Sequence, residues 1–246
     1  MPQDINRPST SAGGDMRMLD NPVWRSLKGV HRALALTDDR GRAARYPADV
    51  SPFMALPDDA TQRDWEALAR IAGPDPVLIM DAPANAPASW KLTRAVPIYQ
   101  MVATDAATQP GKRRTAAFPI DILGPSDAGE LRELARIAEP GPFELRTPQL
   151  GTFIGARNGD GTLIAMAGER MRPGGWTEIS AICTHPDYRG KGLARACTQQ
   201  MIDIITGRGE RPFLHVLTTN TSAVGLYESM GFAIRRTALN SVYEPD

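Results

Sequence analysis

The sequence predicts a mixed α/β protein whose sheet is organised around the segment Trp176–Ala194. Residues 176–184 follow the period of two that is typical of a β-strand, and Pro186 ends it because proline cannot donate to a sheet ladder. A glycine-bearing loop comes next, and it opens a helix. The apolar residues of this helix recur at helical spacing: Leu193, Cys197, Met201 and Ile204.

The loop Arg189–Ala194 has the features of a phosphate-binding site. Gly190 and Gly192 let the backbone approach a ligand closely, and the N–H groups and dipole of a helix N-terminus attract an anion. Arg189 and Lys191 add positive charge beside it. The loop matches neither G-x-x-x-x-G-K-[ST] nor G-x-G-x-x-G with its ribose-reading acid, and reads R-x-x-G-x-A instead.

A second motif lies downstream, between Pro212 and Phe232. A strand leads to Asn220, a short helix carries Ala223 and Tyr227, and Gly231 precedes Phe232. This N-x-x-A-x-x-x-Y-x-x-x-G-F order, together with the R-x-x-G-x-A loop, resembles the GNAT acetyltransferase superfamily. The C-terminal half looks like the glycine N-acyltransferase-like branch, whose members often carry a second, non-catalytic lobe in front.

The resemblance implies an acyl-CoA N-acyltransferase fold, acetyl-CoA (coenzyme A) as co-substrate and no metal. The central strand and its neighbour are expected to separate after a bulge, with the pantetheine arm between them. By the same resemblance, the residues that bind coenzyme A are Ile182, Cys183, Thr184, Arg189, Gly190, Lys191, Gly192, Leu193, Ala194, Asn220, Ser222 and Tyr227. Ile182 and Thr184 are expected to act through backbone groups, so that ordinary sheet residues would look the same.

Composition shifts along the chain predict four segments. Residues 1–18 are polar and are expected to be a disordered tail, and residues 19–104 form a smaller α/β lobe without visible chemistry. Residues 105–117 read as a linker, and residues 118–246 as the GNAT domain. The resemblance implies that the first lobe is a degenerate copy of the same fold. Within it, the apolar spacing predicts a helix over 21–35 and strands over 77–80 and 96–103.

Glu178 is a candidate general base. It lies in a strand that helices should cover on both faces, where burial would raise the pKa of a carboxyl and suit it to take a proton from an ammonium group, directly or through water. The alternative is a salt bridge to Arg170 or Arg172.

Tyr227 matches the family's general acid, which would protonate the departing thiolate. A thiol pKa of about 8.5 already makes thiolate a tolerable leaving group, so the acid assists. The alternative is a tyrosine that packs on the sheet. Asn220 would tie the strand end to the following helix, which a plain helix cap would also do.

Other polar residues have both structural and functional interpretations. His215 lies in an apolar strand and is either a satisfied core residue or a proton relay, whereas His185 stands at a loop edge. Cys183 and Cys197 have no recognisable base beside them, which argues against a covalent acyl-enzyme route. The cluster Lys112-Arg113-Arg114 is either solvated linker charge or a reach toward coenzyme A phosphates.

Composition excludes several classes of function. With 28 basic and 28 acidic residues the net charge is zero, which argues against nucleic acid as a partner. Two cysteines do not make a disulfide scaffold, and no apolar run is long enough to span a bilayer or serve as a secretory signal. We expect a cytoplasmic protein, a monomer or a homodimer, without membrane or nucleic-acid partners.

The sequence therefore predicts an acyl-CoA-dependent N-acyltransferase that moves acetyl to a primary amine by direct attack in a ternary complex. Two alternatives stay open: an enzyme that uses a longer acyl-CoA, as glycine N-acyltransferases do, and a non-catalytic acyl-CoA-binding regulatory module. The acceptor amine is not identified by any residue pattern.

Overall fold

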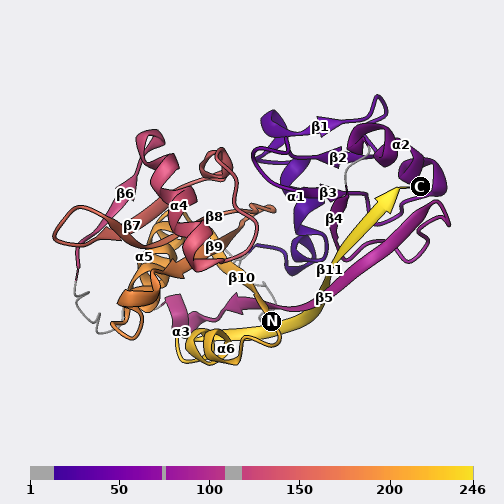
Figure 1. The fold of residues 1–246 in the computed structure, drawn as a ribbon. Helices are drawn as coiled ribbons and strands as arrows, with labels where there is room; N and C mark the ends of the chain where they lie inside the picture. Colours follow the sequence, from indigo (N-terminus) through magenta and orange to yellow (C-terminus); the bar gives the residue numbers. More distant parts are fainter. Residues whose placement is uncertain (1–13, 74–75, 109–117, 246) are drawn as a thin grey trace, which may run out of the picture.

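The computed structural model describes residues 14–73, 76–108 and 118–245. Its strands form one mixed sheet in the order β1-β2-β3-β4-β11-β5-β10-β9-β8-β7-β6 (Figure 1). The strands are β1 Leu36–Thr37, β2 Ala44–Arg45, β3 Phe53–Ala55, β4 Val77–Met80, β5 Trp90–Ala103, β6 Ile120–Leu123, β7 Phe153–Arg157, β8 Leu163–Glu169, β9 Trp176–Thr184, β10 Arg211–Leu217 and β11 Phe232–Pro245. The predicted mixed α/β class is confirmed.

Helices cover the sheet on both faces. The α-helices are α1 Pro22–Leu27, α2 Gln62–Ala72, α3 Asp105–Thr108, α4 Ala128–Ala138, α5 Leu193–Gly207 and α6 Thr221–Glu228. Short 3₁₀ turns are η1 Met16–Leu19, η2 Arg32–Leu34, η3 Pro125–Asp127, η4 Thr147–Leu150 and η5 Pro186–Tyr188. In the described ranges, no helix is both long and apolar enough to cross a membrane.

The long strand β5 connects the two halves of the chain. It pairs antiparallel with β10, from Phe213↔Val102 to Leu217↔Ile98, and antiparallel with β11 along its whole length. In Figure 1, β5 and β11 run side by side from the group of elements that holds α5 to the group that holds α1 and α2. The hydrogen bonds of the sheet therefore cross the predicted boundary between the lobes, because a strand from residues 19–104 lies between two strands of residues 118–246.

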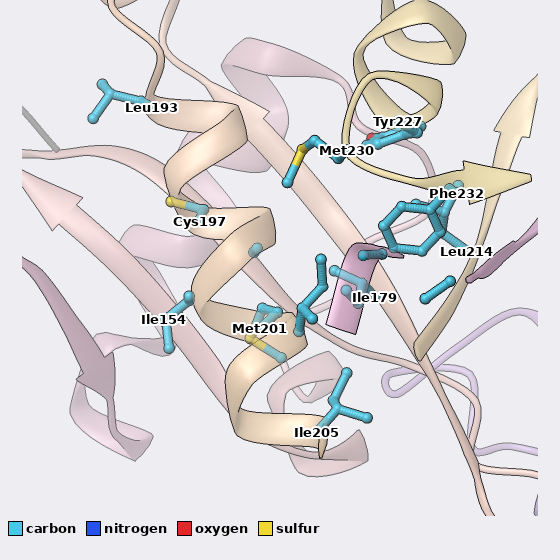
Figure 2. Close-up of a cluster of buried hydrophobic side chains, with 14 of the residues drawn as sticks. Ile154, Ile179, Leu193, Cys197, Met201, Ile205, Leu214, Tyr227, Met230 and Phe232 are labelled. Carbon is cyan, nitrogen blue, oxygen red and sulfur yellow. The ribbon is translucent and has the colours of Figure 1, made fainter. Parts of the chain in front are cut away.

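The two faces of the sheet carry different cores. On one face, α5 presents Leu193, Cys197 and Met201 to the sheet, and Figure 2 shows Tyr227, Met230 and Phe232 gathered beside this helix. On the other face, α4 covers β7, β8 and β9. At the start of β9, the N-terminal elements α1, β2 and β3 pack on Phe213 and Trp176. The start of β9 is thus buried from both sides.

Parts of the predicted segmentation fall outside the described residues. These parts are 1–13 of the tail and 109–117 of the linker, which includes Lys112-Arg113-Arg114. Met16–Leu19 forms η1 with Leu19 fully buried, and Asp105–Thr108 forms α3. The lobe boundaries stay a prediction.

The predicted helix over 21–35 is wrong in its length. Asn21 caps α1 by accepting a hydrogen bond from the backbone N–H of Trp24, but the helix ends at Leu27. The chain then turns so that His31 is buried, with 4% of its surface exposed. Its Nε2–H donates to the carbonyl of Leu150 in η4 at 3.0 Å, and its Nδ1 accepts from the Tyr46 hydroxyl at 2.9 Å. Burial lowers the pKa of His31 to about 4, although the bond to Leu150 acts in the opposite direction.

We expect the protein to lose stability as the pH falls from about 6.5 to about 4. Across this window the His31 imidazole takes up a proton in the unfolded chain but stays neutral in the native state, so the unfolded state binds more protons. The difference in pKa corresponds to roughly 3 kcal/mol at most. Urea unfolding at several pH values measures it, with His31→Gln as the control. Equal slopes of unfolding free energy against pH in the two proteins would contradict the assignment.

Candidate active site

The N-terminus of α5 has the backbone geometry of the predicted phosphate loop. Gly192 is the N-cap residue of the helix and has φ 79°, and Gly190 has φ 78°, a conformation that glycine adopts without strain. The first hydrogen bond of the helix runs from Ala196 N–H to the Gly192 carbonyl at 3.0 Å. The backbone N–H groups of residues 193–195 therefore have no partner inside the helix. A Cβ added at either glycine would meet no atom within 4 Å. The open space and the unpaired first turn fit a phosphate group.

The cations of the loop are exposed. Arg189 and Lys191 lie at the surface, and Lys191 Nζ stands 4.6 Å from the centre of the Tyr188 ring. Leu193 is buried under α5 and Ala194 is partly buried, so they contribute backbone rather than side chains to the loop. Positive charge is therefore available at this end of the helix without being fixed by a carboxylate partner in the described contacts.

Strands β9 and β10 pair only at their beginnings. Their parallel ladder runs from Arg211↔Trp176 to Phe213↔Glu178 and ends there, so residues 179–184 and 214–217 turn to other neighbours. This separation agrees with the expectation from the family resemblance. It opens toward the phosphate loop, because the loop follows the end of β9.

A bulge lies in the separated part of β9. The pairing with β8 shifts between Met166↔Cys183 and Gly168↔Ser180, and Ala181 takes φ 52°. Ile182 beside it is partly buried, and Thr184 ends the strand with a buried hydroxyl oxygen that has no hydrogen-bond partner within the described residues. The backbone of this stretch, predicted to face the pantetheine arm, is thus turned out of the regular ladder.

Glu178 is fully buried and doubly paired. Arg170 donates to it from Nη2 at 2.6 Å and from Nε at 2.9 Å, and His215 Nδ1 lies 2.7 Å from Oε1. Burial alone would raise the pKa of Glu178, but the charge and hydrogen bonds of Arg170 and the hydrogen bond from His215 outweigh it and lower the pKa to about 2. The expected upward shift is therefore wrong, and of the two arginines weighed as partners, Arg170 is the one that forms the salt bridge.

Both ring nitrogens of His215 have hydrogen-bond partners inside the protein. Its side chain is 3% exposed, and its Nε2 lies 3.1 Å from Nε2 of Gln100. Because the Gln100 carbonyl oxygen accepts from Arg235, the amide N–H of Gln100 faces the ring. Nε2 then accepts, and the Nδ1–H donates to Glu178.

Tyr227 lies at the C-terminal part of α6, against Phe232. The ring is 7% exposed, and burial raises its pKa to about 12, so the hydroxyl keeps its proton at neutral pH. Asn220 caps α6 by accepting from the Ala223 N–H at 3.1 Å, and Ser222 is exposed in the first turn. The structure therefore shows the capping role of Asn220.

The two cysteines and His185 show no feature of a catalytic nucleophile or base. Burial raises the pKa of Cys183 and of Cys197 to about 12, which makes both poor nucleophiles. His185 accepts from the Asp187 N–H in η5. Among the described residues, no group of three or more His, Cys, Asp or Glu side chains is arranged to hold a metal ion. The absence of a metal requirement stays a prediction.

The sequence analysis did not locate three features: the residue that forms the expected bulge, a polar partner of His215, and the place of β5 in the sheet. Ala181 carries no sequence signal for a bulge, since its left-handed conformation is normally a glycine signature. Gln100 lies in a strand of the first lobe, and no local pattern indicates its contact with His215, which is 115 residues away in the sequence. The insertion of β5 between β10 and β11 depends on pairing between distant segments, which local patterns do not report.

The comparisons with known proteins agree with this geometry. The FR47-like protein family model matches residues 153–240. A solved structure, a putative acetyltransferase from the GNAT family of Novosphingobium aromaticivorans, is 36% identical with a TM-score of 0.79, over 93% of this chain and 99% of that one. N-alpha-acetyltransferase RimI of Mycobacterium tuberculosis is 37% identical over 92 residues, 36% of this chain and 56% of the relative. Mycothiol acetyltransferase of Beutenbergia cavernae is 36% identical over 76 residues, 30% of this chain and 26% of the relative.

These matches define the class of protein. The chain belongs to the GNAT family of acetyltransferases. It spans about half the length of the RimI relative and about a quarter of the mycothiol acetyltransferase. The predicted family is confirmed, and the glycine N-acyltransferase-like branch stays a prediction.

We expect Gly192→Asp to weaken acetyl-CoA binding by roughly 100-fold or more, because a carboxylate at this position repels an anion at the helix N-terminus. Calorimetric titration with acetyl-CoA and with free coenzyme A measures the change. Gly209→Asp is the matched control: Gly209 follows the same helix with φ 76° and open space for a Cβ, but lies at its other end. Equal loss of affinity in both variants would contradict the loop as the donor site.

Proposed function

We propose that this protein is an acyl-CoA-dependent N-acyltransferase that transfers acetyl from acetyl-CoA to a primary amine in a ternary complex. The observation that carries the proposal is the early end of the β9–β10 ladder beside the bare N-terminus of α5. A donor with a diphosphate and a long arm needs both features together. Family membership supports the same reaction.

The residues present fit such a donor. The amides of residues 193–195, with the charges of Arg189 and Lys191, would hold the diphosphate, while Ile182 and Thr184 would offer backbone groups to the arm. The bulge at Ala181 would direct an N–H of this stretch toward the carbonyl oxygen that becomes negative during attack. When bound, acetyl-CoA supplies an activated thioester.

We assign deprotonation of the acceptor ammonium to solvent water rather than to Glu178. A carboxylate with a pKa of about 2 is a weak base at neutral pH, and both of its oxygens are engaged by Arg170 and His215. The free amine then attacks the carbonyl carbon, its nitrogen gives up a second proton to water, the carbon–sulfur bond breaks, and the thiolate leaves.

Tyr227 is the proposed acid for the leaving thiolate. Its raised pKa keeps the phenol protonated over the whole working range, so a proton is available when sulfur becomes negative. The phenolate would recover a proton from solvent after each turnover.

The experiment that tests the proposal is an assay of coenzyme A release with acetyl-CoA and a panel of amines. The panel contains small alkyl and aryl amines, amino acids, and peptides with a free N-terminus, because no described residue singles out one acceptor. Amine-dependent release of the thiol, with the acetylated amine found by mass spectrometry, supports the proposal. Tight acetyl-CoA binding without transfer to any amine would contradict it and favour a binding module.

Tyr227→Phe is expected to lower kcat by roughly 10- to 100-fold while leaving acetyl-CoA affinity unchanged, because the ring still packs but the proton donor is gone. The effect stays modest because thiolate is a tolerable leaving group. Steady-state kinetics with one amine measures it, and Tyr243→Phe, whose ring packs on Trp65 at the far end of β11, is the control. An unchanged kcat in Tyr227→Phe would remove this residue from the mechanism.

A further inference from the structure

A side-chain bridge joins β9 and β10 at the point where their backbone bonds stop. Glu178 is the last β9 residue in the parallel ladder, and its partner there is Phe213. Two residues farther along β10, His215 reaches back to Glu178 at 2.7 Å. The bridge therefore spans the first step at which the strands are no longer held by their backbones.

This bridge is the centre of a row of polar side chains on one face of the sheet. Arg170 closes the row on the β8 side through two hydrogen bonds to Glu178. Gln100 of β5 closes it on the other side and also donates to the Leu19 carbonyl at 2.9 Å. Arg235 of β11 donates to Gln100 at 2.7 Å and to Asp20. Glu178, His215 and Gln100 are thus each hydrogen-bonded to a neighbour on both sides.

The row is rigid for electrostatic reasons. Glu178, His215 and Gln100 are almost completely shielded from water, and a buried charge or dipole that loses its partner is strongly penalised. Each partner therefore has one favourable position. A row of this kind resists both closure of the two strands into a longer ladder and their further separation.

We propose that Glu178 and His215 are positioning residues that clamp the base of the β9–β10 separation, and so fix where the reacting carbonyl stops. The inference rests on the proposed acyl transfer. It assigns the polar pair a role different from that of an acid or base, since His215 Nε2 faces Gln100 and the ring is buried. Gln100, Leu19 and Asp20 then give the N-terminal half of the chain a part in catalysis: they hold the clamp from the side.

The position of the reacting carbonyl at the base of the β9–β10 separation should affect the rate of transfer rather than the affinity for acetyl-CoA. The diphosphate loop begins at Arg189, beyond the open end of the separation, so donor affinity depends on a different part of the chain. A displacement of the reacting group by about 1 Å can cost about 100-fold in rate. The clamp should therefore appear in kcat and leave the acetyl-CoA dissociation constant unchanged.

The experiment compares His215→Asn with His215→Leu. The Asn amide places an N–H where the imidazole Nδ1–H was and keeps the bond to Glu178, although it gives up the contact with Gln100, and it does not titrate. The Leu side chain has a similar size and cannot bridge. We expect His215→Asn to keep kcat within a few-fold of wild type, with the same pH–rate profile, and His215→Leu to lose roughly 100-fold in kcat with acetyl-CoA affinity retained.

Two results would overturn the clamp. Equal loss of kcat in both variants, with loss of the acidic limb of the pH–rate profile, would make His215 a base. A folded His215→Leu protein with wild-type kcat would make the bridge unimportant. If His215→Leu does not fold, His215→Asn decides alone, because a loss of more than about 30-fold there contradicts positioning.

A second measurement separates this inference from the proposed function. Hydrogen–deuterium exchange over residues 176–184 and 211–217 reports the clamp without any turnover. We expect wild type and His215→Asn to exchange alike, and His215→Leu to exchange faster in these two segments only. Unchanged exchange in His215→Leu rejects the clamp. Failure of the wild type to acetylate any amine rejects the proposed function, whatever the exchange result.

Discussion

The pairing of the buried, ionised Glu178 carboxylate with Arg170 and His215 is the interaction on which the rest of the structure depends. A charge with no exposure is stable only when paired and hydrogen-bonded, and Glu178 obtains this from Arg170, directly after β8, and from His215 on β10. His215 in turn needs a donor for its second nitrogen, which Gln100 supplies from β5. One acidic residue in the central strand therefore requires polar partners on two other strands and directly after a third, and this explains why an apolar strand such as β10 contains a histidine.

The position of β5 follows from the same logic and unites the chain. Because β5 lies between β10 and β11, residues before and after the predicted linker form one ladder, and neither half has a complete sheet alone. Further contacts tie the halves together: Thr147 Oγ1 donates to the Val50 carbonyl at 2.8 Å, and His31 Nε2 to that of Leu150. The N-terminal residues therefore complete the sheet of the family fold, and their strands share its ladders.

Local patterns predicted the parts of this structure that local chemistry determines. The bounds of β9 and β4, the glycines before α5, and the Asn220–Tyr227 helix all followed from alternation, turn residues and spacing. What failed depends on distant contacts. The helix expected over 21–35 ends early, at Leu27, and the turn that follows buries His31 between Tyr46 and Leu150. The direction of the Glu178 pKa shift could not be derived from burial alone, because the sign depends on how closely Arg170 approaches.

Charged groups at the two ends of the β9–β10 separation differ in exposure and pairing. At the open end, the proposed anion site consists of backbone amides and exposed cations, which would adapt to a ligand and stay hydrated without one. At the closed end, every charge has a fixed partner inside the protein, so no group there can rearrange cheaply. We therefore expect affinity for a donor and the geometry of its reacting carbon to be controlled by separate parts of the chain. Since Gln100 and Leu19 hold the closed end, we expect sequence changes in the N-terminal half to act on the reaction geometry without changing the proposed phosphate loop.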